Sequence, residues 1–131
     1  MGNSICLDSD FLIDLLRNKK EAAEWIKDNE ENNILGTTII NLFELYSGAY
    51  RAANFENKLV AVKKLESKLK ILNFSLRSAE EAGKQNALLD KKGMQIEKRD
   101  LFIGVIALSE GFSLKTNNKK HFYRIEGLRV V

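Results

Sequence analysis

Short apolar runs alternate with helical patterns along most of the chain, and this alternation limits the possible folds more than any other feature. Strand-like runs are expected at residues 4–7, 34–39, 71–74, 112–116 and 128–131, and most are separated by apolar residues at steps of three and four. Parallel strands need crossover connections, which helices usually provide. The sequence therefore predicts an α/β fold in which a mainly parallel sheet of about five strands is covered by helices on both faces.

The length and composition indicate one folded unit. The chain has 131 residues, of which 44% are hydrophobic and 30% charged, so we expect a single domain spanning residues 1–131 rather than extended disorder. The net charge of +3 and a pI near 9.0 only weakly favour a nucleic-acid partner, because a binding surface also needs clustered charge.

Several features favour a cytoplasmic location and no membrane contact. The single cysteine, Cys6, excludes an internal disulfide. The longest uncharged apolar run, Leu101 to Leu108, is far shorter than the roughly 18 residues that a membrane span requires. The first residues also lack the basic start of a secretory signal.

Three acidic residues stand where the surrounding pattern favours apolar side chains. Asp8 ends the first predicted strand, and ligands of open parallel sheets bind beyond such strand ends. Glu44 is the only charged residue between positions 39 and 50, and Asp100 begins the most apolar predicted helix. Because parallel topology brings strand ends together, we expect the three acids to lie in one site.

Each acid also has a simpler interpretation. Asp8 or Ser9 can cap the following helix, Glu44 can lie on a narrow polar strip, and Asp100 can interact favourably with a helix N-terminus. Taken together, and without a matching histidine, cysteine or nucleophilic serine arrangement, the acids favour an oxygen-only site for Mg²⁺ or Mn²⁺. Such ions activate water for phosphodiester hydrolysis, so the pattern points to phosphoryl chemistry.

Three segments resemble the PIN domains of VapC-type toxins. They are CLDSDFLIDLLR at 6–17, TTIINLFELYSGAY at 37–50 and RDLFIGVIALSEGFSLKTNNKKHFYRIEGLRVV from residue 99. The resemblance covers nearly the whole chain and implies a three-layer α/β/α fold with Mg²⁺- or Mn²⁺-dependent endoribonuclease activity on RNA. It further implies a toxin that a cognate antitoxin keeps inactive and that often forms a homodimer.

The family's metal-binding acids carry over to three positions, which are Asp8, Glu44 and Asp100. The fourth position departs from the family pattern, because an Asp often found there is replaced within TNNKKHF. Asn118 is the catalytic candidate, although Asn117 or His121 could take that place instead. Since asparagine adds no negative charge, we expect a second ion to bind only weakly and mainly in the presence of RNA phosphate.

Further residues are candidates for contact with the substrate. Ser9 stands where the family often has threonine, and four basic residues flank the elements that carry Asp100 and Asn118; these are Lys98, Arg99, Lys119 and Lys120. His121 is more readily explained as a structural neighbour of Phe122 than as a general base.

Three alternatives remain at this level. Asp8 and Asp10 form a D-x-D pattern that haloacid-dehalogenase-like phosphatases also use, but the distal pair of acids that those enzymes need is missing from TNN. A housekeeping RNA-processing nuclease would share the fold and chemistry. The missing fourth acid also allows a catalytically weak PIN-fold module that binds RNA or protein.

Overall fold

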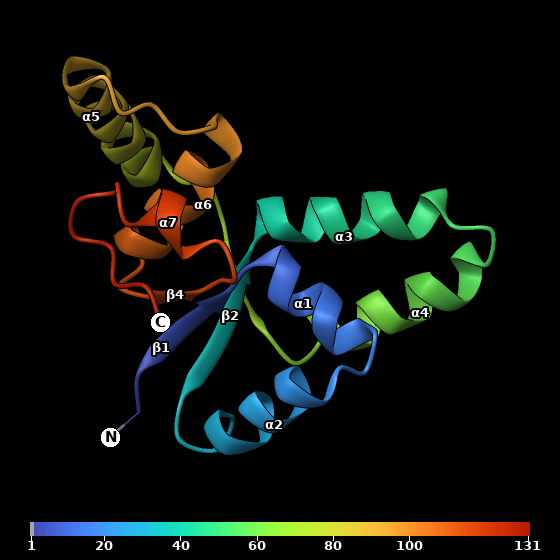
Figure 1. Ribbon diagram of the computed structural model, residues 1–131. Coiled ribbons are helices and arrows are strands. Elements are labelled where there is room, and N and C mark those ends of the chain that lie inside the picture. Colours follow the sequence, from blue (N-terminus) through green and yellow to red (C-terminus); the bar gives the residue numbers. More distant parts are fainter. Residues whose placement is uncertain (1) are drawn as a thin grey trace.

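The computed structural model describes residues 2–131, and its centre is a parallel sheet of four strands (Figure 1). The strands are β1 (Ser4–Leu7), β2 (Ile34–Thr38), β3 (Lys70–Leu72) and β4 (Ser113–Lys115), in the spatial order β3-β2-β1-β4. Strand β1 is central, with Ile5 opposite Leu35 of β2 and Cys6 opposite Leu114 of β4. All strand pairs are parallel, as the alternation of strands and helices predicted.

The predicted fifth strand, at residues 128–131, is reduced to one isolated bridge between Val130 and Leu114. Pairing there consists of two hydrogen bonds, from Leu114 N to the Arg129 carbonyl and from Val131 N to the Leu114 carbonyl, each 2.8 Å long. Within residues 2–131, the backbone of the segment after Gly127 therefore pairs with β4 at Leu114 alone. The expectation of about five strands is corrected to four.

Helices cover both faces of the sheet, which confirms the three-layer arrangement. They are α1 (Ser9–Leu16), α2 (Lys20–Asn29), α3 (Ile39–Arg51), α4 (Phe55–Glu66), α5 (Leu76–Lys92), α6 (Lys98–Ser109) and α7 (Lys119–Phe122). In Figure 1, α1 to α4 lie on one side of the sheet and α5 to α7 on the other. Each side has its own apolar core: alternate β1 residues point opposite ways, so Ile5 and Leu7 join the first core and Cys6 the second.

Capping boxes mark the start of two helices, α3 and α5. The Thr38 side chain accepts the Asn41 N–H, and the Asn41 side chain accepts the Thr38 N–H, so the two residues form a capping box at the start of α3. The same arrangement begins α5, where Ser75 is the cap residue and Ser78 is its partner.

Helix α6 is apolar on nearly all sides, and it lies buried among α5, the sheet and the C-terminal segment. A side chain at Gly104 would collide with Ile125, so glycine permits this close approach. The packing brings Asp100, in the first turn of α6, to the edge of the sheet where β1 and β4 end. Within residues 2–131, no helix combines the length and apolarity needed to cross a membrane.

Candidate active site

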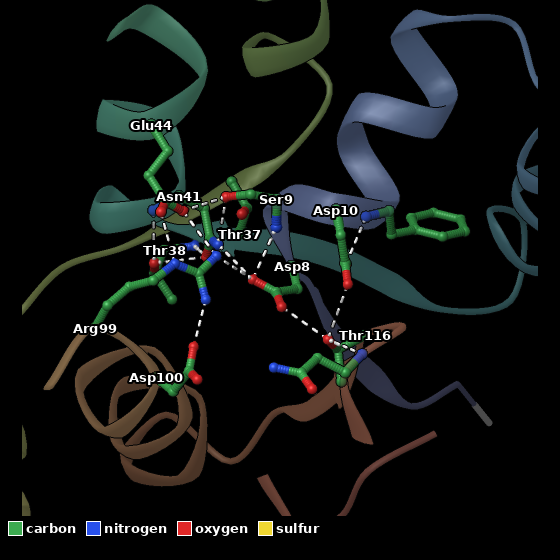
Figure 2. A network of polar contacts seen from close by, with 12 residues as sticks. Asp8, Ser9, Asp10, Thr37, Thr38, Asn41, Glu44, Arg99, Asp100 and Thr116 are labelled. Carbon is green, nitrogen blue, oxygen red and sulfur yellow. Dashed lines mark hydrogen bonds and ion pairs between the residues drawn. The ribbon is translucent and has the colours of Figure 1, made fainter. Parts of the chain in front are cut away.

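Polar residues collect at the edge of the sheet where three parallel strands end (Figure 2). Asp8 follows β1, Thr38 ends β2 and Thr116 follows β4. Glu44 comes from the second turn of α3 and Asp100 from the first turn of α6. The three acids singled out in the sequence therefore do lie together, at the edge where open parallel sheets bind their ligands.

Asp8 is the most deeply placed acid, with only 1% of its surface exposed. Its Oδ1 accepts hydrogen bonds from the Ser9 N–H at 2.8 Å and from Asn41 Nδ2 at 2.9 Å, and its Oδ2 accepts one from Thr116 Oγ1 at 2.7 Å. These donors replace the water that a buried carboxylate loses. Asp8 also caps α1, so the simpler interpretation describes one of its contacts rather than all of them.

Glu44 lies nearer to solvent, with 30% of its side chain exposed. Its Oε1 accepts a hydrogen bond from Ser9 Oγ at 2.6 Å, and Arg99 donates to both carboxylate oxygens, through Nε at 2.6 Å and Nη2 at 2.8 Å. Burial by itself would raise the pKa of Glu44, but the hydrogen bonds from Arg99 and Ser9, with the charge of Arg99, outweigh it and lower that pKa.

Asp100 is buried and connects to the segment that was expected to supply the fourth family position. Its Oδ1 pairs with Arg99 Nη1, and its Oδ2 lies 3.4 Å from His121 Nδ1. Asn118 Nδ2 is in turn 3.1 Å from the same histidine nitrogen. Asn118 and His121 therefore lie on the Asp100 side of the site, whereas Asn117 contacts Asp10 through its N–H at 3.0 Å.

Arg99 occupies the centre of the acidic cluster (Figure 2). Besides Glu44 and Asp100, its guanidinium contacts Asp8, with Nη2 3.1 Å from Oδ1. Although burial opposes the charged form, the hydrogen bonds and negative charges of these acids raise the pKa of Arg99 further above its ordinary value. One fixed positive charge thus lies among three carboxylates.

The donor chemistry of the cluster suits a hard divalent cation, but the side chains as placed converge on the guanidinium. Within residues 2–131, no three aspartate, glutamate, histidine or cysteine side chains are grouped so that they could hold a metal ion. The three carboxylates offer the oxygen ligands that Mg²⁺ and Mn²⁺ prefer. The residue types therefore fit such an ion, provided that Arg99 moves.

Several residues of the network were not identified from the sequence. Asn41 and Thr116 are fully buried and both donate to Asp8. The Thr37 hydroxyl donates to the Leu7 carbonyl at 2.7 Å and so ties the ends of β1 and β2 together. A threonine pair at a strand end, followed three residues later by asparagine in an apolar helix, was the available signal.

Asp10 also belongs to the edge of the site. It accepts hydrogen bonds from the N–H groups of Phe11 at 2.6 Å and Asn117 at 3.0 Å. Burial and the nearby charge of Asp8 raise its pKa. This residue therefore holds the loop after β4 against α1.

The remaining basic candidates are arranged differently from Arg99. Lys98 donates to Asn86 at 3.0 Å, away from the acids. Lys119 and Lys120 are exposed on α7, which follows Asn118. Of the four basic residues that the sequence grouped together, Arg99 alone contacts the carboxylates in the described part of the chain, residues 2–131.

Comparison with known proteins gives concordant results. The family model described as "PIN domain" matches residues 5–128. Ribonuclease VapC1 of Haemophilus influenzae strain R2866 is 32% identical over 124 residues, covering 94% of this chain and 92% of that protein. The tRNA(fMet)-specific endonuclease VapC of Salmonella typhimurium is 31% identical, covering 95% and 93%. A chain in the crystal structure of VapBC2 from Rickettsia felis bound to a promoter DNA fragment superposes with a TM-score of 0.91 at 26% identity, covering 98% and 97%.

Proposed function

This chain belongs to the PIN-domain family, and from that premise we propose that it is an endoribonuclease of the VapC type that hydrolyses RNA phosphodiester bonds with Mg²⁺ or Mn²⁺. The observation that carries the proposal is the convergence of Asp8, Glu44 and Asp100 from three separate elements on one sheet edge. The names of the VapC relatives support ribonuclease activity. All 131 residues would form the one catalytic domain.

The three acids would hold the ion. Asp8, Glu44 and Asp100 supply only oxygen ligands, as hard divalent cations require. When bound, such an ion supplies the Lewis acidity that hydrolysis of a phosphodiester needs. The site carries three carboxylates against one guanidinium, so its charge favours a cation.

Neighbouring residues keep these acids in position. Asn41 and Thr116 hold both oxygens of Asp8, which fixes the direction of its remaining lone pairs. Ser9 donates its hydroxyl to Glu44, and this contact orients that carboxylate toward Asp8. Asn118 would position a reacting water or the RNA beside Asp100, because its amide nitrogen and Oδ2 of that acid lie 3.1 Å and 3.4 Å from the same nitrogen of His121.

RNA would approach over the basic residues at the open side of the site. Lys98, Lys119 and Lys120 are exposed on the first turn of α6 and on α7, the two elements that carry or follow Asp100 and Asn118. Exposed lysines bind phosphate without reading base sequence. This arrangement would position the RNA backbone, leaving sequence choice to other contacts.

We further propose that the protein is a cytoplasmic toxin with a cognate antitoxin, and that it forms a homodimer. The VapBC structures that resemble this chain support the antitoxin partner. Expression of the chain alone should arrest bacterial growth, and co-expression of the product of the adjacent gene should relieve the arrest. Normal growth with undiminished RNA cleavage would instead favour a housekeeping nuclease.

The direct test of the activity is RNA cleavage by purified protein with Mg²⁺ or Mn²⁺. Asp8→Asn and Asp100→Asn keep the shape of each side chain but remove its charge, and each should reduce the cleavage rate by at least about 100-fold, since even outer partners of metal sites are worth 10- to 100-fold. Asp28→Asn, an exposed position on α2, is the matched control and should cleave normally. Undiminished cleavage by both site variants would contradict the assignment.

A second candidate is a PIN-fold module that binds RNA with little catalysis. The position of Arg99 among the acids and the asparagine at the expected fourth position favour it. RNA binding without cleavage, unchanged after addition of Mn²⁺ up to about 10 mM, would support this candidate over a nuclease.

A further inference from the structure

Arg99 uses all three of its guanidinium nitrogens on the acids that are proposed to bind the ion. Nε and Nη2 donate to Glu44, Nη2 also lies 3.1 Å from Asp8 Oδ1, and Nη1 pairs with Asp100 Oδ1. Both Glu44 oxygens and one oxygen from each aspartate are therefore engaged by a single side chain. This side chain comes from the residue directly before Asp100, so its backbone is fixed by α6.

We propose that Arg99 is an internal cation that competes with the divalent ion for these three carboxylates and must leave them before the ion binds. The inference rests on the proposed metal site. An ion held by these acids would take its ligands from the same carboxylate oxygens that the guanidinium nitrogens contact. The two cations cannot use these ligands together.

The surroundings of Arg99 allow it to move. Its side chain is 31% exposed and that of its partner Glu44 is 30% exposed, so both side chains border the solvent. Asp8 would stay in place without it, because Ser9, Asn41 and Thr116 still donate to that carboxylate. Displacement of Arg99 thus leaves a preformed set of acids rather than a disordered one.

Competition of this kind has a measurable consequence: the affinity for the ion includes the cost of separating Arg99 from its three partners. The guanidinium keeps the like charges from repelling one another at low ion concentration, and it sets the concentration at which the ion replaces it. An arginine is well suited to act as the competing cation, because it remains charged at all accessible pH values.

The test is Mn²⁺ binding by the full chain, measured by calorimetry and by the electron paramagnetic resonance signal of free Mn²⁺. Arg99→Gln should bind Mn²⁺ at least about tenfold more tightly than the unmodified protein. Arg17→Gln is the matched control, since Arg17 is exposed and lines the same groove as Glu44 but lies outside the carboxylate network. At about 0.15 M salt, Arg17→Gln should change the Mn²⁺ affinity by no more than about twofold.

Equal affinities of Arg99→Gln and Arg17→Gln would overturn the inference, because general electrostatics would then account for any change. Equal binding by the unmodified protein and Arg99→Gln would also overturn it while leaving the proposed metal site intact. Absence of binding by both proteins up to about 10 mM Mn²⁺ would overturn the metal site itself and the inference with it.

Two additional substitutions complete the test. One replaces Arg99→Gln if that variant does not fold, and the other shows whether the ion binds at the three acids. Arg99→Lys keeps the charge but lacks the planar fork, so it should bind Mn²⁺ more tightly than the unmodified protein and less tightly than Arg99→Gln. If Arg99→Gln does not fold, Arg99→Lys takes its place in the test. A Mn²⁺ affinity of Arg99→Lys equal to that of the unmodified protein would then overturn the inference that Arg99 competes with the ion. Adding Asp100→Asn to either variant should abolish the gain; a persisting gain would place the ion elsewhere and overturn the inference.

Discussion

The site has an inner half and an outer half, and they are held together by different forces. The inner half consists of Asp8, Asn41 and Thr116, each buried and joined by hydrogen bonds from neutral donors. The outer half consists of Arg99 and Glu44, whose side chains are 31% and 30% exposed and whose contacts depend largely on charge. The inner half is therefore a rigid support, whereas the outer half can rearrange when another charged species binds.

The largest effect should come from breaking the inner half. Asn41→Ala removes two donations, to Asp8 and Ser9, and the acceptor of the Thr38 hydroxyl. Because buried polar groups are then left unpaired, the free energy of unfolding should fall by about 3 kcal/mol in urea denaturation. Asn57→Ala, at an exposed position of α4, should change it by less than about 0.5 kcal/mol. Similar losses in both variants would contradict the rigid-support description.

A smaller effect, with a different dependence on salt, is expected in the outer half. Arg99→Gln should lower the free energy of unfolding by about 1 kcal/mol at low ionic strength, since partly exposed ion pairs contribute little. The loss should shrink as NaCl rises from about 0.1 M to about 1 M, because the screening length falls from about 10 Å to about 3 Å. The loss of free energy of unfolding caused by Asn41→Ala should not shrink as salt rises. If the two variants lose stability with the same dependence on salt, the inner and outer halves are not held by different forces.

The smallest effect concerns a polar contact outside both halves, between α3 and α4. The Tyr46 hydroxyl donates to Glu66, and this bond, with burial and the charge of Glu66, raises the pKa of Tyr46 to about 12. Because the pKa of Tyr46 is higher in the folded protein, its hydrogen bond contributes fully to stability at pH values below about 10, the pKa in the unfolded chain. This contribution is lost as the pH rises through the pKa of the folded protein. Tyr46→Phe should therefore cost about 0.5–1 kcal/mol at neutral pH.

Tyrosinate absorbance gives the matching measurement. The chain has three tyrosines, and Tyr46 should ionise at higher pH than an ordinary tyrosine. The late step in the absorbance titration should be missing in Tyr46→Phe. A late step that persists in this variant would show that another tyrosine causes it.

Much of the site was predictable because acids in apolar segments are conspicuous. Asp8, Glu44 and Asp100 each interrupt a pattern that otherwise indicates burial, and parallel topology places their elements at one sheet edge. Asn41 was missed because asparagine on a helix is usually explained by partial exposure. Its burial depends on the start of α3 lying beside the residues that follow β1, where Asn41 contacts Asp8 and Ser9, and no local pattern encodes this.

The position of Arg99 could not have been inferred from spacing. A basic residue beside Asp100 in the sequence predicts contact with RNA phosphate as readily as contact with acids, and that prediction remains to be tested. The choice depends on how far the side chain reaches from α6 to Glu44 on α3. The fold shows the same limit: strand positions followed from apolar runs, but the reduction of residues 128–131 to one bridge depends on tertiary contacts.

The capping box of α3 has a consequence for any attempt to move this site to another scaffold. Asn41 completes the first turn of the helix together with Thr38, and the same side chain donates to Asp8. The start of α3 and the orientation of Asp8 thus depend on the same side chain, that of Asn41. A transplanted set of three carboxylates would therefore need Thr38 and Asn41 grafted with it, and directed evolution could not vary the helix start without altering the geometry of Asp8.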